Sequence, residues 1–255
     1  MISNPIHIQM KTKFIVAAAA ALSFCSIASA QTNLQTFYDF GKDRKFVTTT
    51  LEMFKGDNWG STFFFVDYDY TTKENRQHDV YGARSSYFEI ARALNFWQDS
   101  KLGALSAHVE FNSGVSFGTS NFLFGGEYFL HSKDFSKTLT LELLYKTFQG
   151  SSSDLPLQFT AVWGIQNLFG LQGLTFSGFM DIWGENTSYW YGETNPLGFE
   201  KASFILLSEP QIWYNVGRHF GCDNLNIGAE AEIAMNFAGK HGFWFRPCLG
   251  TKWVF

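Results

Sequence analysis

The feature that most constrains this chain is a regular alternation of polar and apolar residues, recurring in segments of roughly ten residues from residue 33 onward. Ser106, His108, Glu110 and Asn112 occupy even-numbered positions there, and apolar residues fill the odd-numbered positions between 105 and 111. Side chains of a β-strand point alternately to opposite faces, so this period predicts strands with one polar and one apolar face. Twelve such strands are expected, at residues 33–40, 46–54, 59–70, 84–94, 103–115, 121–131, 137–149, 155–166, 174–183, 203–217, 224–237 and 242–255.

A membrane-spanning barrel accounts for this pattern better than a membrane helix does. After residue 30 no apolar run approaches the roughly 20 residues that such a helix requires. Mean hydropathy is only -0.09 although 18% of the residues are aromatic, so apolar and polar residues are interleaved. The expected fold is all-β, a transmembrane antiparallel up-and-down β-barrel of about 12 strands in the cell outer membrane.

A soluble exported β-sandwich is the alternative, since it produces the same alternation. Three features favour the barrel. Charged residues fall on one parity in most strands, and aromatic residues gather near strand ends. The last expected strand contains Trp253 and Phe255, similar to the terminal signal that outer-membrane assembly recognises.

The first 30 residues have the pattern of a secretory signal peptide. Two lysines precede an apolar run at residues 14–24, and residues 28–30 form an A-x-A cleavage pattern. The expected organisation is a signal peptide at residues 1–30, cleaved after Ala30, and an outer-membrane barrel at residues 31–255. A retained N-terminal anchor is the alternative.

Charge and cysteine content limit the partners of the mature part. Without the first 30 residues, 17 of the 19 basic residues remain against 23 acidic ones. Nucleic acid is therefore not an expected partner, because duplex binding needs a basic surface. Cys222 lies in an expected turn and Cys248 within a strand, which does not bring them together, but their pairing stays open.

The connections between the expected strands differ in length. Residues 55–58, 167–173 and 218–223 form short turns, whereas residues 71–83 and 184–202 form long polar loops. Short periplasmic turns and longer external loops are typical of outer-membrane barrels, although the alternation here is imperfect.

Strand parity places more acids than bases on the face expected to line the lumen. The expected inward acids are Glu52, Asp67, Asp69, Glu89, Glu110, Glu127, Glu142, Asp181, Glu209, Glu230 and Glu232, and the expected inward bases are His108, Lys146, Arg246 and Lys252. Such a lumen disfavours anions, so neutral polar solutes and cations are the expected cargo. Phe63, Phe65, Phe179 and Trp213 share the inward parity and could either stack on a planar base or pack the lumen shut. A structural network of the acids with Arg246, Lys252 and Arg92 is the alternative for the charges.

Several stretches resemble strands of one known family. TTTLEMF at residues 48–54 and FFFVDYDY at residues 63–70 resemble the second and third strands of Tsx-type nucleoside-specific channel-forming proteins. YFEIAR at residues 87–92 is similar to the following strand, and SEPQIWYN at residues 208–215 to a late strand. The resemblance is clear over the first third of the chain and patchy beyond it. It implies a monomeric barrel that passes nucleosides, with the lumen residues of the matched strands lining the path.

The candidate lumen-lining and solute-contacting residues are Glu52, Phe63, Phe65, Asp67, Asp69, Glu89, Glu110, Glu127, Trp213 and Arg246. No H-E-x-x-H, C-x-x-C or P-loop motif accompanies them, and Asp67 with Asp69 supplies too few ligands for calcium. We therefore expect a channel for small polar solutes, nucleosides first, with no enzymatic activity, cofactor or metal. The alternatives are a non-conducting structural or interaction barrel and a membrane-embedded hydrolase that uses His131.

Overall fold

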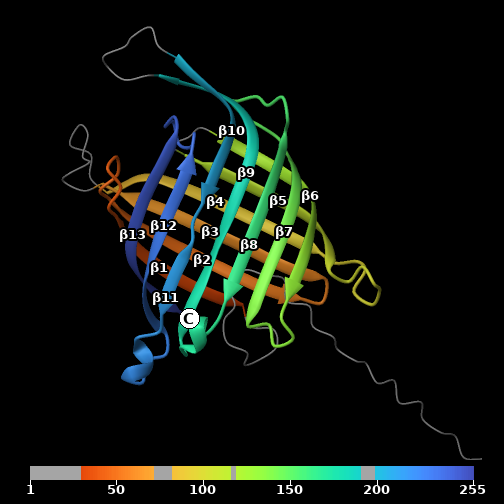
Figure 1. Cartoon of the computed structure of the whole chain (residues 1–255), viewed down its shortest axis with the longest axis vertical. Coiled ribbons are helices and arrows are strands. Elements are labelled where there is room, and N and C mark those ends of the chain that lie inside the picture. Colours follow the sequence, from red (N-terminus) through yellow and green to blue (C-terminus); the bar gives the residue numbers. More distant parts are fainter. Residues whose placement is uncertain (1–29, 72–81, 116–118, 191–198) are drawn as a thin grey trace, which may run out of the picture.

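The computed structural model describes residues 30–71, 82–115, 119–190 and 199–255. In this part of the chain one antiparallel sheet curves round and closes on itself (Figure 1). Its strands are β1 (Gln31–Asp39), β2 (Val47–Asp57), β3 (Gly60–Tyr70), β4 (Ala83–Leu94), β5 (Leu105–Gly114), β6 (Thr119–His131), β7 (Lys137–Lys146), β8 (Leu157–Ile165), β9 (Leu174–Trp190), β10 (Phe199–Ser208), β11 (Gln211–Tyr214), β12 (Leu225–Met235) and β13 (Phe243–Val254). Two short 3₁₀ turns, η1 (Leu168–Gly170) and η2 (Gly217–His219), lie in connections. No described helix has the length and apolar character that would let it cross a membrane.

The strands form a closed barrel with the predicted number of strands. Neighbouring strands pair antiparallel, and the pairing of β1 with β13 closes the ring. β10 and β11 are two parts of one strand, because both pair with β9 and β12 and the register does not change across the break between them. Ser208 lies opposite Met180, and Gln211 lies opposite Ser177. The thirteen strand segments therefore make a barrel of twelve strands, which confirms the prediction.

Pro210 interrupts the strand that was predicted to run unbroken over residues 203–217, so that prediction is wrong in detail. Proline lacks the N–H that a central strand needs. The neighbouring strands still pair across the break, since the Ala231 N–H donates to the Pro210 carbonyl at 3.0 Å. Gly178 faces the break with φ of 153°, and a Cβ there would lie 2.8 Å from Pro210 Cα. The absence of a side chain at Gly178 thus admits the proline.

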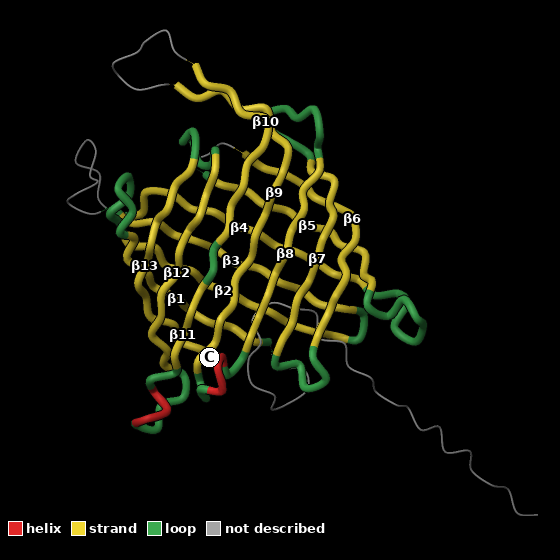
Figure 2. Tube along the Cα trace, in the orientation of Figure 1, coloured by secondary structure: helices red, strands yellow, loops and turns green. Residues whose placement is uncertain are grey.

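The predicted loop at residues 184–202 is largely a hairpin. β9 continues to Trp190 and β10 begins at Phe199, with Lys201 opposite Ser188. The hairpin projects beyond the rim of the barrel at the top of Figure 2. The alternation fails as a signal here because both faces of a strand outside the bilayer meet water. Residues 191–198, most of the predicted loop at 71–83, and all but the last residue of the predicted signal peptide lie outside the described residues.

The two faces of the sheet differ as the alternation predicts. Outward positions carry large apolar side chains such as Leu143 and Leu249, each 59% exposed. Inward positions carry polar side chains shielded from water, such as Gln35 and Arg246, each 1% exposed. A soluble sandwich would bury its apolar face instead, so that alternative is wrong. An apolar exterior and a sheet without edges are what a bilayer requires.

Trp213 and Phe37 fill one side of the barrel interior. Trp213 has no exposed surface, and its ring lies 5.4 Å from that of Phe37, centroid to centroid. Gly228 and Gly250 lie directly opposite each other on β12 and β13, beside these rings. A Cβ at Gly228 would overlap the Trp213 ring, and a Cβ at Gly250 would lie 2.6 Å from Phe37 Cδ1. Both glycines therefore make room for the aromatic pair.

Gly228→Ala is expected to lower the free energy of unfolding by about 1–3 kcal/mol, the usual cost of overpacking a well-filled interior. Urea unfolding in lipid vesicles, followed by tryptophan fluorescence, measures this change. Gly126→Ala is the control, because a Cβ there meets nothing closer than the Ser106 carbonyl oxygen at 3.6 Å. Equal effects of the two substitutions would contradict the packing argument.

Cys222 and Cys248 both carry free thiols in the described part of the chain. Cys248 lies on β13, and Cys222 lies in the turn that follows η2. The expectation that strand register keeps them apart is therefore confirmed.

Candidate functional site: the barrel interior

All ten candidate lining residues occupy inward-facing strand positions. Their neighbours in sequence point outward, as Leu51, Tyr68 and Ile90 show by being 39%, 43% and 38% exposed. The structure separates the ten into an accessible wall, two buried clusters of charged residues and the packed Trp213. Whether any of them contacts a solute stays a prediction.

The accessible part of the interior is the β2–β4 wall, which we define as Glu52, Phe63, Phe65, Asp67, Asp69, Tyr87 and Glu89. All seven side chains are only half-buried. Threonines of β2 hold the two aspartates, since Thr50 Oγ1 donates to Asp67 at 2.6 Å and Thr48 Oγ1 donates to Asp69 at 2.7 Å. These bonds follow from the register, which places Thr50 opposite Asp67 and Thr48 opposite Asp69. The sequence repeat T-x-T beside D-x-D thus builds an ordered row of carboxylates.

Aromatic rings lie beside these carboxylates on the same wall. Phe65 lies 5.8 Å from Phe63 and 5.6 Å from Tyr87, centroid to centroid. The Tyr87 hydroxyl donates to Glu89 Oε2 at 3.1 Å. Ring faces and hydrogen-bond acceptors are therefore available side by side, a combination suited to a planar polar solute.

The first buried cluster, which we call the arginine cluster, contains Asp39, Asp43, Arg44, Glu232 and Arg246. Arg246 forms ion pairs with Glu232 and, at 2.8 Å, with Asp43. Arg44 forms ion pairs with Glu232 at 2.6 Å and with Asp39 at 3.3 Å. Asp43 and Arg44 come from the short connection between β1 and β2, which therefore bends into the barrel instead of remaining outside.

The charges within this cluster shift the pKa of both loop residues. Burial alone would raise the pKa of Asp43, but the hydrogen bond and positive charge of Arg246 hold that pKa below its usual range. Burial would lower the pKa of Arg44, but the carboxylates of Glu232 and Asp39 raise it overall. Both groups are thus ionised at neutral pH.

Sequence reasoning identified Arg246 and Glu232 but missed the other members of the arginine cluster. Asp39 lies within the first predicted strand, at residues 33–40, and could have been found by applying the inward parity of that strand to it. Asp43 and Arg44 lie in the charged run Lys42–Lys45, between the first two predicted strands. No periodic signal marks a turn that folds inward.

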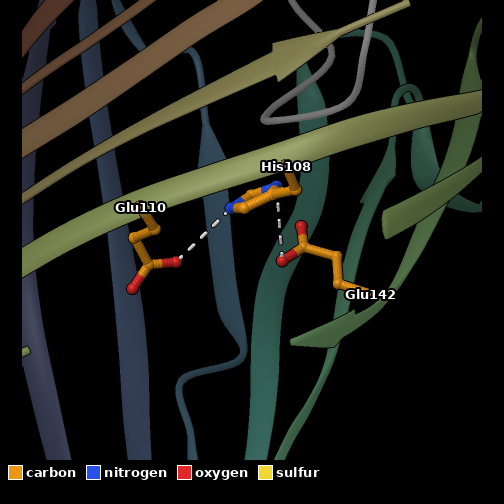
Figure 3. Close-up of side chains that lie close together, drawn as sticks. All are labelled: His108, Glu110 and Glu142. Carbon is orange, nitrogen blue, oxygen red and sulfur yellow. Dashed lines mark ion pairs between the residues drawn. The ribbon is translucent and has the colours of Figure 1, made fainter. Parts of the chain in front are cut away.

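The second buried cluster, the acid–histidine cluster, contains His108, Glu110, Glu127 and Glu142. His108 Nδ1 lies 2.9 Å from Glu127 Oε2 and 3.8 Å from Glu142 Oε2. His108 Nε2 lies 3.6 Å from Glu110 Oε2. Figure 3 shows Glu110 and Glu142 on opposite sides of the imidazole, with both carboxylates turned toward it. Ligand atoms of His108, Glu110 and Glu142 all lie within 4.8 Å of one another, so these three are the residues of the described chain that could hold a metal ion.

The inward lysines lie over tryptophan rings. Lys252 Nζ is 4.4 Å from the centroid of Trp213, and Lys146 Nζ is 3.9 Å from that of Trp183. Such cation–π contacts stabilise a buried ammonium. Trp213 is thus enclosed by Phe37 and Lys252, which favours the packing alternative for this candidate.

Arg92 does not belong to the interior network in which the sequence analysis placed it. Its position on β4 has the outward parity of Ile90, and it pairs with Asp57 at 2.7 Å near the turn between β2 and β3. The error arose because one-residue alternation within β4 was not applied to this arginine.

Comparison with known families identifies the chain at the family level. Residues 30–255 match the family described as Domain of unknown function (DUF5020). The chain belongs to the DUF5020 family. No curated protein sequence matches it significantly.

Three solved porin structures align with this DUF5020 protein. The NanC porin aligns with a TM-score of 0.53 at 8% identity, covering 87% of this chain and 98% of that one. The KdgM porin aligns with a TM-score of 0.48 at 10% identity over 88% and 99% of the two chains. A BenF-like porin from Pseudomonas fluorescens Pf-5 gives 0.44 at 9% identity over 91% and 99%.

The similarity to the NanC porin and the apolar outer surface both indicate a membrane-spanning β-barrel. This DUF5020 protein is a closed, twelve-stranded antiparallel β-barrel of the outer membrane. The predictions of fold class and localisation are confirmed. The finer resemblance to Tsx-type channels is not addressed by these matches and stays a prediction.

Proposed function

We propose that this DUF5020 protein is a passive outer-membrane channel for small polar solutes that are neutral or cationic. The observation that carries this proposal is the excess of carboxylates over bases on the inward positions of a closed barrel, in keeping with the porin-like fold. Rings of fixed negative charge raise the energy of an anion inside a pore. Phosphorylated solutes are therefore excluded in this proposal.

Nucleosides are the leading solute class, and the β2–β4 wall is their proposed contact surface. Phe63, Phe65 and Tyr87 offer ring faces on which a base can stack, worth about 1–3 kcal/mol per base. The carboxylates of Asp67 and Glu89 can accept hydrogen bonds from sugar hydroxyls. The Tsx-type resemblance of the same three strands supports this assignment, and a monomeric barrel is part of it.

Conductance in planar lipid bilayers tests both parts of the proposal. The purified protein is expected to add discrete conductance steps, and a nucleoside is expected to reduce the current more strongly than its 5′-phosphate does. Phe65→Ala should weaken the block about 5-fold to 100-fold, matching the loss of one stacked ring. Phe124→Ala is the control, because that outward side chain is 51% exposed to the lipid side. Conductance that nucleosides do not block would support the channel but contradict nucleosides as its solute.

A non-conducting structural barrel is the second candidate, and the dense interior favours it. Asn33, Gln35, Glu232 and Arg246 are between 1% and 4% exposed although they face the lumen. Side chains packed this tightly leave little room for water. Absence of any conductance above background would select this candidate.

The hydrolase alternative has little support from the geometry. His131 Nδ1 lies 2.8 Å from the carbonyl of Ser132, while the Ser132 hydroxyl donates to Asp134 instead. The sequence does contain one G-x-S-x-G match, at residues 114–118, between two strands. In hydrolases that motif presents the nucleophilic serine at a turn between a strand and a helix, whereas here it lies between two strands. Residues 116–118 lie outside the described residues.

A further inference from the structure

The acid–histidine cluster concentrates negative charge in a buried site on three adjacent strands. Glu127 and Glu142 lie directly opposite each other on β6 and β7, and His108 and Glu110 point inward from β5. The four side chains are between 4% and 7% exposed. Carboxylates placed directly opposite each other repel, and buried charges need compensation. Three carboxylates share one imidazole here, which leaves an excess of negative charge.

Glu127 orients the imidazole and sets which nitrogen carries the proton. An ionised carboxylate can only accept hydrogen bonds, so its 2.9 Å contact places the hydrogen on His108 Nδ1. In the neutral imidazole, the form that binds metal ions, the lone pair is then on Nε2. A histidine held by a carboxylate through one nitrogen while the other binds a cation is the usual arrangement around metal ions in proteins.

The free nitrogen points at a second carboxylate but does not bond to it. His108 Nε2 is buried and has no hydrogen-bond partner. Its 3.6 Å separation from Glu110 Oε2 is too long for a hydrogen bond. Two ligands of one tetrahedral ion, each about 2.0–2.2 Å from the metal, lie roughly 3.4 Å apart. The observed gap therefore fits an ion between the two atoms better than a direct contact.

One further buried acceptor of the cluster lacks a partner. Glu127 Oε1 has no hydrogen-bond partner, although Glu127 Oε2 contacts His108. A buried polar group without a partner costs free energy, so His108 Nε2 and Glu127 Oε1 together indicate a missing ligand.

We propose that His108 Nε2 and Glu110 bind a divalent transition-metal cation between them, with Zn²⁺ as its best-fitting representative. Glu142 faces Nδ1 at 3.8 Å, but ligand atoms of the three residues lie within 4.8 Å of one another, and its carboxylate turns toward the ion as the third ligand. One imidazole and two carboxylates are ligands that suit Zn²⁺, whereas Ca²⁺ and Mg²⁺ prefer oxygen ligands alone. Three protein ligands leave one position open to water or a solute in the lumen. Binding here does not depend on conduction by the barrel.

Isothermal titration of the folded, chelator-treated barrel in detergent with ZnSO4 tests the site. One Zn²⁺ per barrel is the expected stoichiometry, with CaCl2 giving no comparable heat. Titration with CoCl2 should give a visible absorption band that reports nitrogen and oxygen ligands. If the wild-type barrel shows neither stoichiometric Zn²⁺ binding nor a Co²⁺ spectrum, the proposal is overturned without any variant.

Three substitutions separate the ligands from the orienting residue. His108→Ala and Glu110→Gln should weaken Zn²⁺ binding by at least about 100-fold, and Glu127→Gln by about 10-fold to 100-fold. The matched controls are His131→Ala, an exposed histidine, and Glu230→Gln, an inward acid on β12, and both should keep the wild-type affinity. Folding of each variant is checked by the heat-dependent migration of the barrel in gel electrophoresis. Unchanged affinity in folded His108→Ala would show that the metal binds elsewhere and would overturn the assignment.

Discussion

Arg246→Met is expected to lower the free energy of unfolding by about 3–5 kcal/mol, which is the typical cost of breaking a buried ion pair from one side. Arg246 is 1% exposed and forms ion pairs with both Glu232 and Asp43. Methionine replaces the length of the side chain but neither its charge nor its hydrogen bonds. The three carboxylates of the arginine cluster would then remain in the interior with only Arg44 to compensate them.

Arg92→Met is the matched control for this experiment. Arg92 also binds an aspartate through two hydrogen bonds, but at a partly exposed position on the outer face near a turn. Exposed pairs contribute about 0–1 kcal/mol, because water solvates both charges after the pair is broken. Urea unfolding in vesicles compares the two variants directly. Similar losses would mean that the arginine cluster is accessible to water and that the barrel is more open than its burial indicates.

Neutralising Asp67 and Asp69 together is expected to reduce the preference of the channel for cations over anions by at least about 25-fold. Both carboxylates face the accessible part of the interior and are held there by threonines of β2. A unit charge about 4 Å from a passing ion in water contributes about 1 kcal/mol, or roughly a fivefold change in partition, for each aspartate. Asp67→Asn with Asp69→Asn keeps the shape and most of the hydrogen bonds.

Reversal potentials in a salt gradient measure this selectivity. Asp134→Asn is the control, because the carboxylate of Asp134 is exposed in the connection between β6 and β7, where serine hydroxyls hold its pKa at about 2. It therefore carries the same charge without facing the lumen. An unchanged reversal potential in the double variant would show that the ions pass along another part of the interior. This prediction rests on conduction and is distinct from the stability test of Arg246.

Much of this site could be predicted because a β-strand converts sequence parity into direction. Once Leu51 and Ile90 are placed outward, Glu52 and Glu89 must point inward, whatever the rest of the barrel does. The same reasoning located Arg246 and the four members of the acid–histidine cluster on the inner face. It went wrong at Arg92, where parity was not applied, and at Pro210, where a neighbouring glycine admits an interruption.

The sequence by itself determined the class of fold, the outer-membrane setting and which residues face the lumen, since the alternation of polar and apolar residues can be followed along each strand. Only the tertiary structure decided which inward residues meet. Asp43 and Arg44 reach the interior through the path of a short loop, and His108 meets Glu142 only through the register of β5, β6 and β7. These contacts depend on how twelve strands are staggered when the barrel closes, and no single strand carries that information.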